Sequence, residues 1–200
     1  MLASSRVSTV GQPGRRRSER SHRAILAATQ QLLVERGYPG VSIEGIAARA
    51  GVGKQTIYRW WPSKAALVLE AYLAGEDAVS HPDAAGSTRE NVRALLSWLV
   101  AVLAEPTGGA VVAGLVAELP HDAGLADGFR RDVVPARREA MLTALERGRE
   151  RGDIRAGADL ELAVDELHGA VFYRLLLSGE PLDEAFVVRL ADQVLAGLSP

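Results

Sequence analysis

The segment from Val41 to Leu69 contains two short stretches of helical character separated by a glycine turn. In the first stretch, apolar residues recur at i, i+3, i+4 and i+7, which places them on one face of a helix. These residues are Ile43, Ile46, Ala47 and Ala50. Ser42 is positioned to cap the amino end, and Gly51 to end the helix, because glycine adopts positive φ without steric cost. The pattern predicts a helix over residues 43–50.

The second stretch, from Lys54 to about Trp61, is mostly polar. Ile57 can pack back on the first helix, whereas most of its neighbours point elsewhere. So polar a surface is typical of a helix that docks on a polar partner. Two short helices joined by a glycine turn, the second of them polar and basic, have the layout of a helix-turn-helix that reads DNA.

The remaining two thirds of the chain show helical periodicity throughout and no convincing strand pattern. Helices are expected over residues 62–73, 110–119 and 125–151, and also between Ser87 and Pro106, with a polar connection at 75–86. Ser87, followed three residues later by a glutamate, has the signature of a capping box. Pro135 is expected to kink the longest helix or to divide it, and Gly152 to end it. We therefore expect an all-α protein.

The last two predicted helices, residues 159–178 and 183–198, have apolar surfaces too broad for one buried face. We expect a second subunit to cover part of them, so that two helices from each chain form a four-helix dimer interface. The expected interface residues are Leu160, Leu167, Val171, Leu175, Phe186, Leu190 and Val194. The alternative is a monomeric core that buries both helices.

The helix-turn-helix residues, SIEGIAARAGVGKQTIYRWWPSKAAL up to Leu67, resemble the DNA-binding domain of TetR-family (tetracycline-repressor-like) transcriptional regulators. The resemblance extends upstream through a helix at about Glu19–Arg36, which supplies the third wall of a small core. Two positions depart from the commonest motif: Gly53 replaces the usual Ser or Thr cap, and Trp60 stands where histidine or another aromatic residue is common. The resemblance implies a helix-turn-helix domain at 19–65 and a helical effector-binding and dimerisation domain at 66–200.

Residue chemistry suggests which side chains of the second helix contact DNA. Gln55 can make a bidentate contact to adenine, Thr56 can meet a base edge or a thymine methyl group, and Arg59 can reach guanine or a phosphate. By the family motif, the residues expected to contact the DNA backbone are Lys54, Tyr58, Trp60 and Lys64. Ser42 completes the expected DNA-binding set. Packing is the alternative role for the two aromatic residues of this group, and it is the preferred interpretation of Trp61.

The family resemblance also implies a homodimer that binds a palindromic operator, represses transcription and is released by a small-molecule effector. Two recognition helices about 34–36 Å apart would fit successive major grooves. The candidate effector-pocket residues are Trp98, Val102, Leu115, Phe129, Met141, His168 and Phe172. For each of them a plain core role is the preferred interpretation. His168, a polar residue in an apolar helix, needs a partner, either a protein acceptor or an effector. A ligand-independent or architectural DNA-binding protein is the alternative function.

Charge is divided unevenly along the chain. Residues 1–65 carry nine Arg and two Lys against three Glu, a net charge of +8, while the remaining 12 basic and 22 acidic side chains give −10. The basic end attracts a polyanion and the acidic end is repelled by it, which orients the protein on nucleic acid. Residues 1–18 are expected to form a flexible basic arm that can lie along phosphates or enter a minor groove.

Other functional classes find little support. Neither a GxxxxGK[ST] nor a GxGxxG motif occurs, and the four histidines are scattered, so we expect no enzyme, no metal site and no cofactor. No apolar run is long enough to span a membrane, and residues 1–18 do not resemble a secretory signal. The chain has no cysteine, which is compatible with the cytoplasmic location that we expect.

Overall fold

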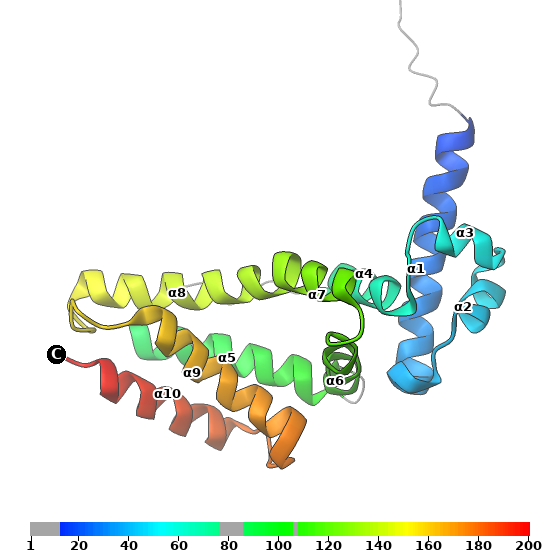
Figure 1. Ribbon diagram of the computed structural model, residues 1–200. Coiled ribbons are helices and arrows are strands. Elements are labelled where there is room, and N and C mark those ends of the chain that lie inside the picture. The colour runs from blue at the N-terminus through cyan, green and yellow to red at the C-terminus, as the bar shows by residue number, and fades with distance from the viewer. Residues whose placement is uncertain (1–12, 77–85, 106–107) are drawn as a thin grey trace, which may run out of the picture.

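The computed structural model describes residues 13–76, 86–105 and 108–200, and within these ranges it contains helices and no strands. The helices are α1 (Pro13–Gly40), α2 (Ile43–Ala50), α3 (Lys54–Tyr58), α4 (Lys64–Glu76), α5 (Thr88–Ala104), α6 (Gly108–Glu118), α7 (Ala123–Gly128), α8 (Val134–Arg151), α9 (Leu160–Tyr173) and α10 (Glu184–Leu198). Helices α1–α4 form a small head at one end, and α5, α8, α9 and α10 lie together as a bundle (Figure 1). The expected all-α fold is confirmed.

Helix α2 has the predicted bounds and the predicted caps. The Ser42 Oγ accepts a hydrogen bond from the Gly45 amide at 3.1 Å. At the other end Gly51 adopts φ 66° and ψ 35°, and its amide donates to the last turn of the helix. The capping residues at the two ends therefore determine the bounds of this helix.

Helix α1 is longer than predicted. It begins at Pro13, six residues before the expected start at Glu19, because a proline has no N–H to lose in the first turn and its φ already suits a helix. Part of the expected flexible arm is thus helical, and residues 1–12 of that arm lie outside the described residues. Gly37, with φ 64° and ψ 173°, interrupts the helix directly after Arg36, where the sequence predicts its end.

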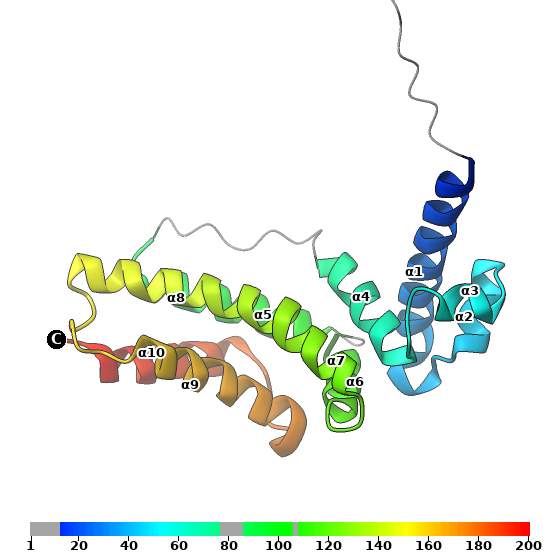
Figure 2. The ribbon, with the colours of Figure 1, turned by 45° about the horizontal axis from the view of Figure 1, so that its top comes forward.

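Two hydrophobic cores hold the chain together. The first lies in the head and extends into α6 and α7; its fully buried members include Ile25, Leu32, Ile46, Ile57, Leu67, Val68, Leu115 and Leu125. The second fills the bundle and includes Val92, Leu96, Met141, Leu145, Val164, Leu167, Val171 and Ala191. Tyr72 of α4 packs against both cores. Figure 2 shows the head at one end of the molecule and the carboxyl terminus at the far end of the bundle.

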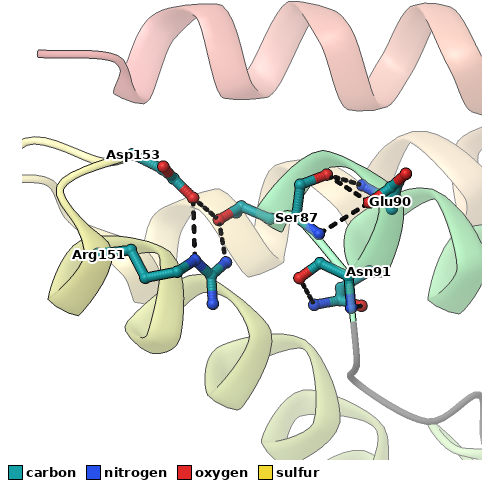
Figure 3. Close-up of polar contacts among 7 residues, drawn as sticks. Ser87, Glu90, Asn91, Arg151 and Asp153 are labelled. Atoms are coloured by element: carbon teal, nitrogen blue, oxygen red, sulfur yellow. Dashed lines mark hydrogen bonds and ion pairs between the residues drawn. The ribbon is translucent and has the colours of Figure 1, made fainter.

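The start of α5 is joined to the end of α8 by partly buried polar contacts (Figure 3). Ser87 and Glu90 form the predicted capping box. The neighbouring Thr88 Oγ1 is buried; it donates to the Asp153 carboxylate at 2.7 Å and accepts from the Arg151 guanidinium at 2.7 Å. These hydrogen bonds satisfy the buried Thr88 hydroxyl, so its burial leaves no polar group without a partner.

Pro135 divides the long helix that the sequence predicts over residues 125–151. The chain forms α7, then a π-helical turn (Phe129–Val133), and then α8 with Pro135 in its first turn. A proline cannot donate an amide hydrogen bond and its ring crowds the preceding turn, so the ladder changes register there. The Val134 amide instead donates to the Phe129 carbonyl, five residues back. Gly152, with φ 82°, ends α8 as predicted.

The last two helices begin directly after Asp159 and Asp183, whose side chains cap them, within one residue of the predicted starts. Five of the predicted dimer-interface residues are buried in the bundle's own core: Leu160, Leu167, Val171, Phe186 and Val194. Leu175 and Leu190 are half-buried and pack against the same core. The periodicity identified broad apolar surfaces, but α5 and α8 cover more of them than expected. The large apolar side chains that stay exposed on α9 and the π-helical turn after it are Leu162, Tyr173, Leu176 and Leu177.

In the described part of the chain, no single helix is long and apolar enough to cross a membrane; α5 and α6 pass that test only as a bent pair. Both helices contribute buried residues to the protein's cores. The polar connection expected at residues 75–86 lies largely outside the described residues.

Replacing Gly148 by alanine is expected to destabilise the protein. A Cβ atom built at this helical position would lie 2.4 Å from the Thr88 Oγ1 and 3.1 Å from the Thr88 Cβ, so the start of α5 would have to shift. Overpacking of this kind costs about 1–3 kcal/mol, more than alanine gains in helix propensity. Urea unfolding should therefore show a lower free energy of unfolding for Gly148→Ala. The matched control is Gly197→Ala in α10, where a Cβ meets nothing within 4 Å and no loss is expected.

Candidate nucleic-acid interface and effector site

The helix-turn-helix is built around the buried Ile57, which packs α3 against the head core. The turn is tight: the Val52 amide donates to the Ala47 carbonyl at 3.0 Å, directly after the left-handed Gly51. Gly53 precedes α3 and gives it no side-chain cap, which is the departure from the family motif noted in the sequence. The first amides of α3 are therefore not bonded to a capping side chain.

Most of the predicted DNA-binding residues lie on the outer side of the head. Lys54, Gln55, Tyr58, Arg59 and Trp60 are exposed, and Thr56 is half-buried. Tyr58 and Trp60 are the large apolar side chains among them, at 49 % and 42 % exposure. Since packing would bury these two rings, their exposure favours the contact role over the packing alternative.

Two of the predicted cationic contacts already have partners within the head. The Lys54 ammonium lies 3.0 Å from the Glu44 Oε1, and this pairing lowers the pKa of Glu44 and raises that of Lys54. The half-buried Lys64 places its Nζ 4.0 Å from the centre of the Tyr38 ring and donates to the Tyr38 carbonyl at 3.4 Å. Ser42 is exposed but uses its hydroxyl to cap α2. Contacts from these three residues to DNA remain a prediction.

A cluster behind α3 was not predicted from the sequence. The Trp61 Nε1 donates to the Glu70 Oε2 at 2.6 Å, and the His22 Nε2 lies 3.1 Å from the other oxygen of the same carboxylate. The His22 ring stacks on Trp61 at 4.7 Å and meets Trp60 edge-on at 4.8 Å. Trp61 is buried, as its preferred packing role requires. The cluster joins the end of α3 to α1 and α4, and a carboxylate in the apolar run of α4 was the one local signal for it.

The head is fixed to the rest of the protein at α6 and α7. The Ser63 hydroxyl, before α4, donates to Asp122, the cap of α7, at 2.7 Å. The buried Tyr38 ring lies so close to α6 that a Cβ added at Gly114 would be 2.5 Å from it. Burial, followed by the nearby Glu118 carboxylate, raises the pKa of Tyr38 to about 12. The orientation of the head therefore depends on α6 and α7.

A small cavity of about 10 Å³ lies inside the bundle between α5, α8 and α9. Its lining residues are Leu95, Trp98, Leu99, Arg137, Ala140, Met141 and His168. At this size it holds one water molecule at most. Three of the seven predicted pocket residues, Trp98, Met141 and His168, meet here.

The other four predicted pocket residues do not line this cavity. Leu115 and Phe129 belong to the head core, because α6 and the turn after α7 pack toward the head. Val102 is half-buried on α5, and Phe172 packs against the bundle core. The seven residues therefore do not form one site. The remaining lining residues, Leu95, Leu99, Arg137 and Ala140, were not predicted from the sequence.

His168 has a protein acceptor, one of the two partners expected for it. Its Nδ1 lies 2.9 Å from the Val164 carbonyl, one turn earlier on α9, and must donate there because a carbonyl only accepts. Burial lowers the pKa of His168, and the charges of Arg137 and Arg138 lower it further. The ring is therefore neutral at pH 7.

Comparison with known proteins places both parts of the chain in one family. Residues 25–71 match the family model described as bacterial regulatory proteins, tetR family. Residues 82–194, more than half of the chain, match the one described as tetracyclin repressor-like, C-terminal domain. The chain belongs to the TetR family. Members of this family are DNA-binding transcriptional regulators and not enzymes, so the TetR resemblance noted in the sequence is confirmed.

Individual TetR-family relatives match over nearly their whole length. The HTH-type transcriptional regulator YdeS of Bacillus subtilis is 33 % identical over 186 residues, covering 92 % of this chain and 93 % of its own. The DNA-binding transcriptional repressor TetR of Mycobacteroides abscessus is 33 % identical over 183 residues, covering 90 % and 94 %. The crystal structure of the TetR family transcription regulator SCO0332 is 36 % identical, with a TM-score of 0.74 and coverage of 90 % and 99 %.

The lowered pKa of His168 predicts a pH-dependent contribution to stability. Well above pH 6.5 the ring is neutral in both the folded and the unfolded chain. As the pH falls below 6.5, the unfolded chain takes up a proton that the folded chain still excludes, so the free energy of unfolding decreases. Urea unfolding at pH 7.5 and 5.5 should therefore show a larger decrease for the wild type than for His168→Gln.

The exposed His121 supplies the control for this measurement, since His121→Gln should lose stability in parallel with the wild type. If His168→Gln also ran parallel to the wild type, the buried imidazole would not be excluding the proton.

Proposed function

We propose that this TetR-family protein is a repressor that binds a palindromic operator as a homodimer and leaves it when a small-molecule effector binds inside the bundle. The observation that carries the DNA-reading part is the two-sided character of α3: Ile57 is fully buried, while Gln55 and Arg59 face solvent. The repressor role is supported by the likeness to the DNA-binding transcriptional repressor TetR of Mycobacteroides abscessus.

In this proposal the exposed side of α3 enters the major groove. Gln55 and Thr56 contact base edges, and Arg59 reaches guanine or a phosphate, since amide, hydroxyl and guanidinium groups can read the donor and acceptor pattern there. The residues that contact the backbone phosphates are Lys54, Tyr58, Trp60 and Lys64, with Ser42 beside them at the start of α2. The net charge of +8 over residues 1–65 attracts the duplex before specific contacts form.

A polar groove supports the same docking surface. It lies between the first half of α1, the α2–α3 turn and α3, and it is lined by Ser18, Ser21, Gly51, Val52, Gly53, Thr56 and Arg59. Hydroxyl and guanidinium groups along such a groove can donate to phosphate oxygens. The DNA backbone would therefore pass between α1 and α3.

The proposed dimer uses the exposed face of α9 and the π-helical turn after it. Leu162 is 54 % exposed, Tyr173 59 % and Leu177 77 %, and a Cβ at the intervening Gly169 would meet nothing within 4 Å. An exposed apolar stripe of this kind is typical of an interaction surface. A second copy packed on it would place two α3 helices on one face of the duplex.

The effector part of the proposal rests on the cavity between α5, α8 and α9. Trp98, Met141 and His168 bring aromatic, thioether and imidazole groups to its walls. Its volume of about 10 Å³ is too small for an organic effector, so the walls must separate on binding. The same small volume favours the alternative function, a ligand-independent DNA-binding protein. As a regulator that reads DNA, the protein is expected to act in the cytoplasm.

The two classes of DNA contact should respond differently to mutation. Gln55→Ala should reduce discrimination between the operator and a mismatched duplex by about 1–3 kcal/mol, because it removes a base contact. Lys64→Ala should weaken binding to both duplexes alike and reduce the salt slope by about 1, because it removes a phosphate contact. Fluorescence anisotropy on a selected operator, at several salt concentrations, measures both quantities. The same uniform loss for both variants would contradict the division of roles.

Charge placed on the exposed face of α9 should dissociate the dimer. Tyr173→Glu and Leu177→Glu would each bury a carboxylate in an apolar interface, which is costly without a partner. Light scattering after size exclusion should give the dimer mass for the wild type and the monomer mass for these variants. The control is Val34→Glu on α1, a side chain 69 % exposed outside this face, which should stay dimeric. A monomeric wild type at micromolar concentration would exclude the proposed dimer.

A further inference from the structure

Arg137 connects the bundle cavity with helix α4. Its side chain is half-buried on α8 and lines the cavity. Its Nη2 donates a hydrogen bond of 2.9 Å to the Tyr72 hydroxyl, and the guanidinium carbon lies 6.0 Å from the centre of the Tyr72 ring. A charged group on the cavity wall is thus in direct contact with the helix that carries the head.

The rest of the cavity wall gives Arg137 a distinct chemical role. Leu95, Leu99 and Met141 are apolar, Trp98 is aromatic, and the half-buried His168 is neutral at pH 7. Among the described side chains that line this cavity, Arg137 is the one with a formal charge. A guanidinium in such surroundings offers planar, fixed donors to an anion, and a carboxylate matches two of them at once.

Tyr72 belongs to a helix with contacts in both parts of the molecule. It packs against the head core and the bundle core, and it follows Glu70, which holds Trp61 and His22 at the end of α3. Because Glu70 and Tyr72 both lie on α4, a shift of Tyr72 also moves the carboxylate that holds the end of α3.

We propose that the effector is an organic anion with a flat apolar body, whose acidic group binds Arg137 and displaces the Tyr72 hydroxyl. This inference rests on the proposed effector site. A carboxylate is a stronger acceptor for a guanidinium than a neutral phenol, because both partners of the new hydrogen bonds are charged. Loss of the Arg137–Tyr72 hydrogen bond weakens the attachment of α4 to α8, so the anion binds the arrangement without this hydrogen bond more tightly. By linkage, operator binding and anion binding weaken each other by the same factor.

The test uses matched pairs of aromatic probes that differ in charge: benzoate against benzamide, and 1-naphthoate against 1-naphthamide. Thermal melting of the full-length protein measures binding, and anisotropy of the labelled operator measures release. We expect at least one carboxylate to raise the melting temperature and to weaken operator binding by about tenfold, within the usual range of coupling between sites. The amides should do neither.

Two neighbouring arginines provide the variant and its control. Arg137→Met should abolish both effects of the carboxylate. Arg138→Met should retain them, because Arg138 pairs with Glu161 and Asp165 of α9 and is not among the cavity-lining residues. If Arg137→Met does not fold, Arg137→Lys keeps the charge without the planar fork and should bind the carboxylate less tightly.

The variant Tyr72→Phe distinguishes binding of the carboxylate from the effect of that binding on the head. It removes the hydroxyl that competes for Arg137, so the carboxylate should bind at least as tightly as to the wild type, while its effect on operator affinity should shrink. Undiminished coupling in this variant would show that the Tyr72 contact does not transmit the signal.

Three other results would contradict binding of an anion to Arg137, and each has a different meaning. Equal effects of acid and amide would show that the cavity takes a ligand but does not select charge, which leaves the proposed function intact. Unchanged carboxylate effects in Arg137→Met would place the anion elsewhere. If neither probe acted, the anion inference would be wrong, and operator binding without any probe would still report separately on the DNA-binding function.

Discussion

The packing of α4 against both hydrophobic cores is the constraint on which the rest of this structure depends. The start of α4 is fixed by Ser63 to the α7 cap, and its later turns place Tyr72 between the head core and the bundle core. Interiors are packed densely, so a helix shared by two cores cannot move without disturbing both. The direction in which the head presents α3 is therefore set by the bundle.

Because α4 packs against both cores, the position of α3, the proposed dimer face on α9 and the bundle cavity depend on one another. The polar side of α3 stays exposed because Ile57 and Trp61 hold its other side in the head core. The proposed dimer face on α9 determines where the second head lies, and α4 carries that separation to the recognition helices. In the proposed effector site, Arg137 is the point at which a bound anion would reach α4. The proposed DNA reading and ligand response thus share one helix.

Features that depend on neighbouring residues could be predicted from the sequence. The bounds of α2, its Ser42 cap, the left-handed Gly51 and the Ser87 capping box all follow from hydrogen bonds within a few residues. The exposed residues of α3 were predicted for the same reason, because a five-residue helix with one buried isoleucine leaves its other positions outside. Long-range partners left no such signal: His22 and Glu70 are 48 residues apart in the chain, and periodicity cannot tell whether an apolar face such as that of Leu167 meets a second subunit or the chain's own α5 and α8.

In the proposed dimer, the shared packing of α4 holds the two heads at a fixed separation. The chain has no cysteine, so Ala48→Cys on the exposed side of α2 provides a single spin-label position per subunit. Electron-electron distance measurement on the free protein should give one narrow distance, which persists when the operator is added. A broad distribution would show that α4 does not fix the head, and an absence of dipolar coupling would show that the two heads are not paired at all.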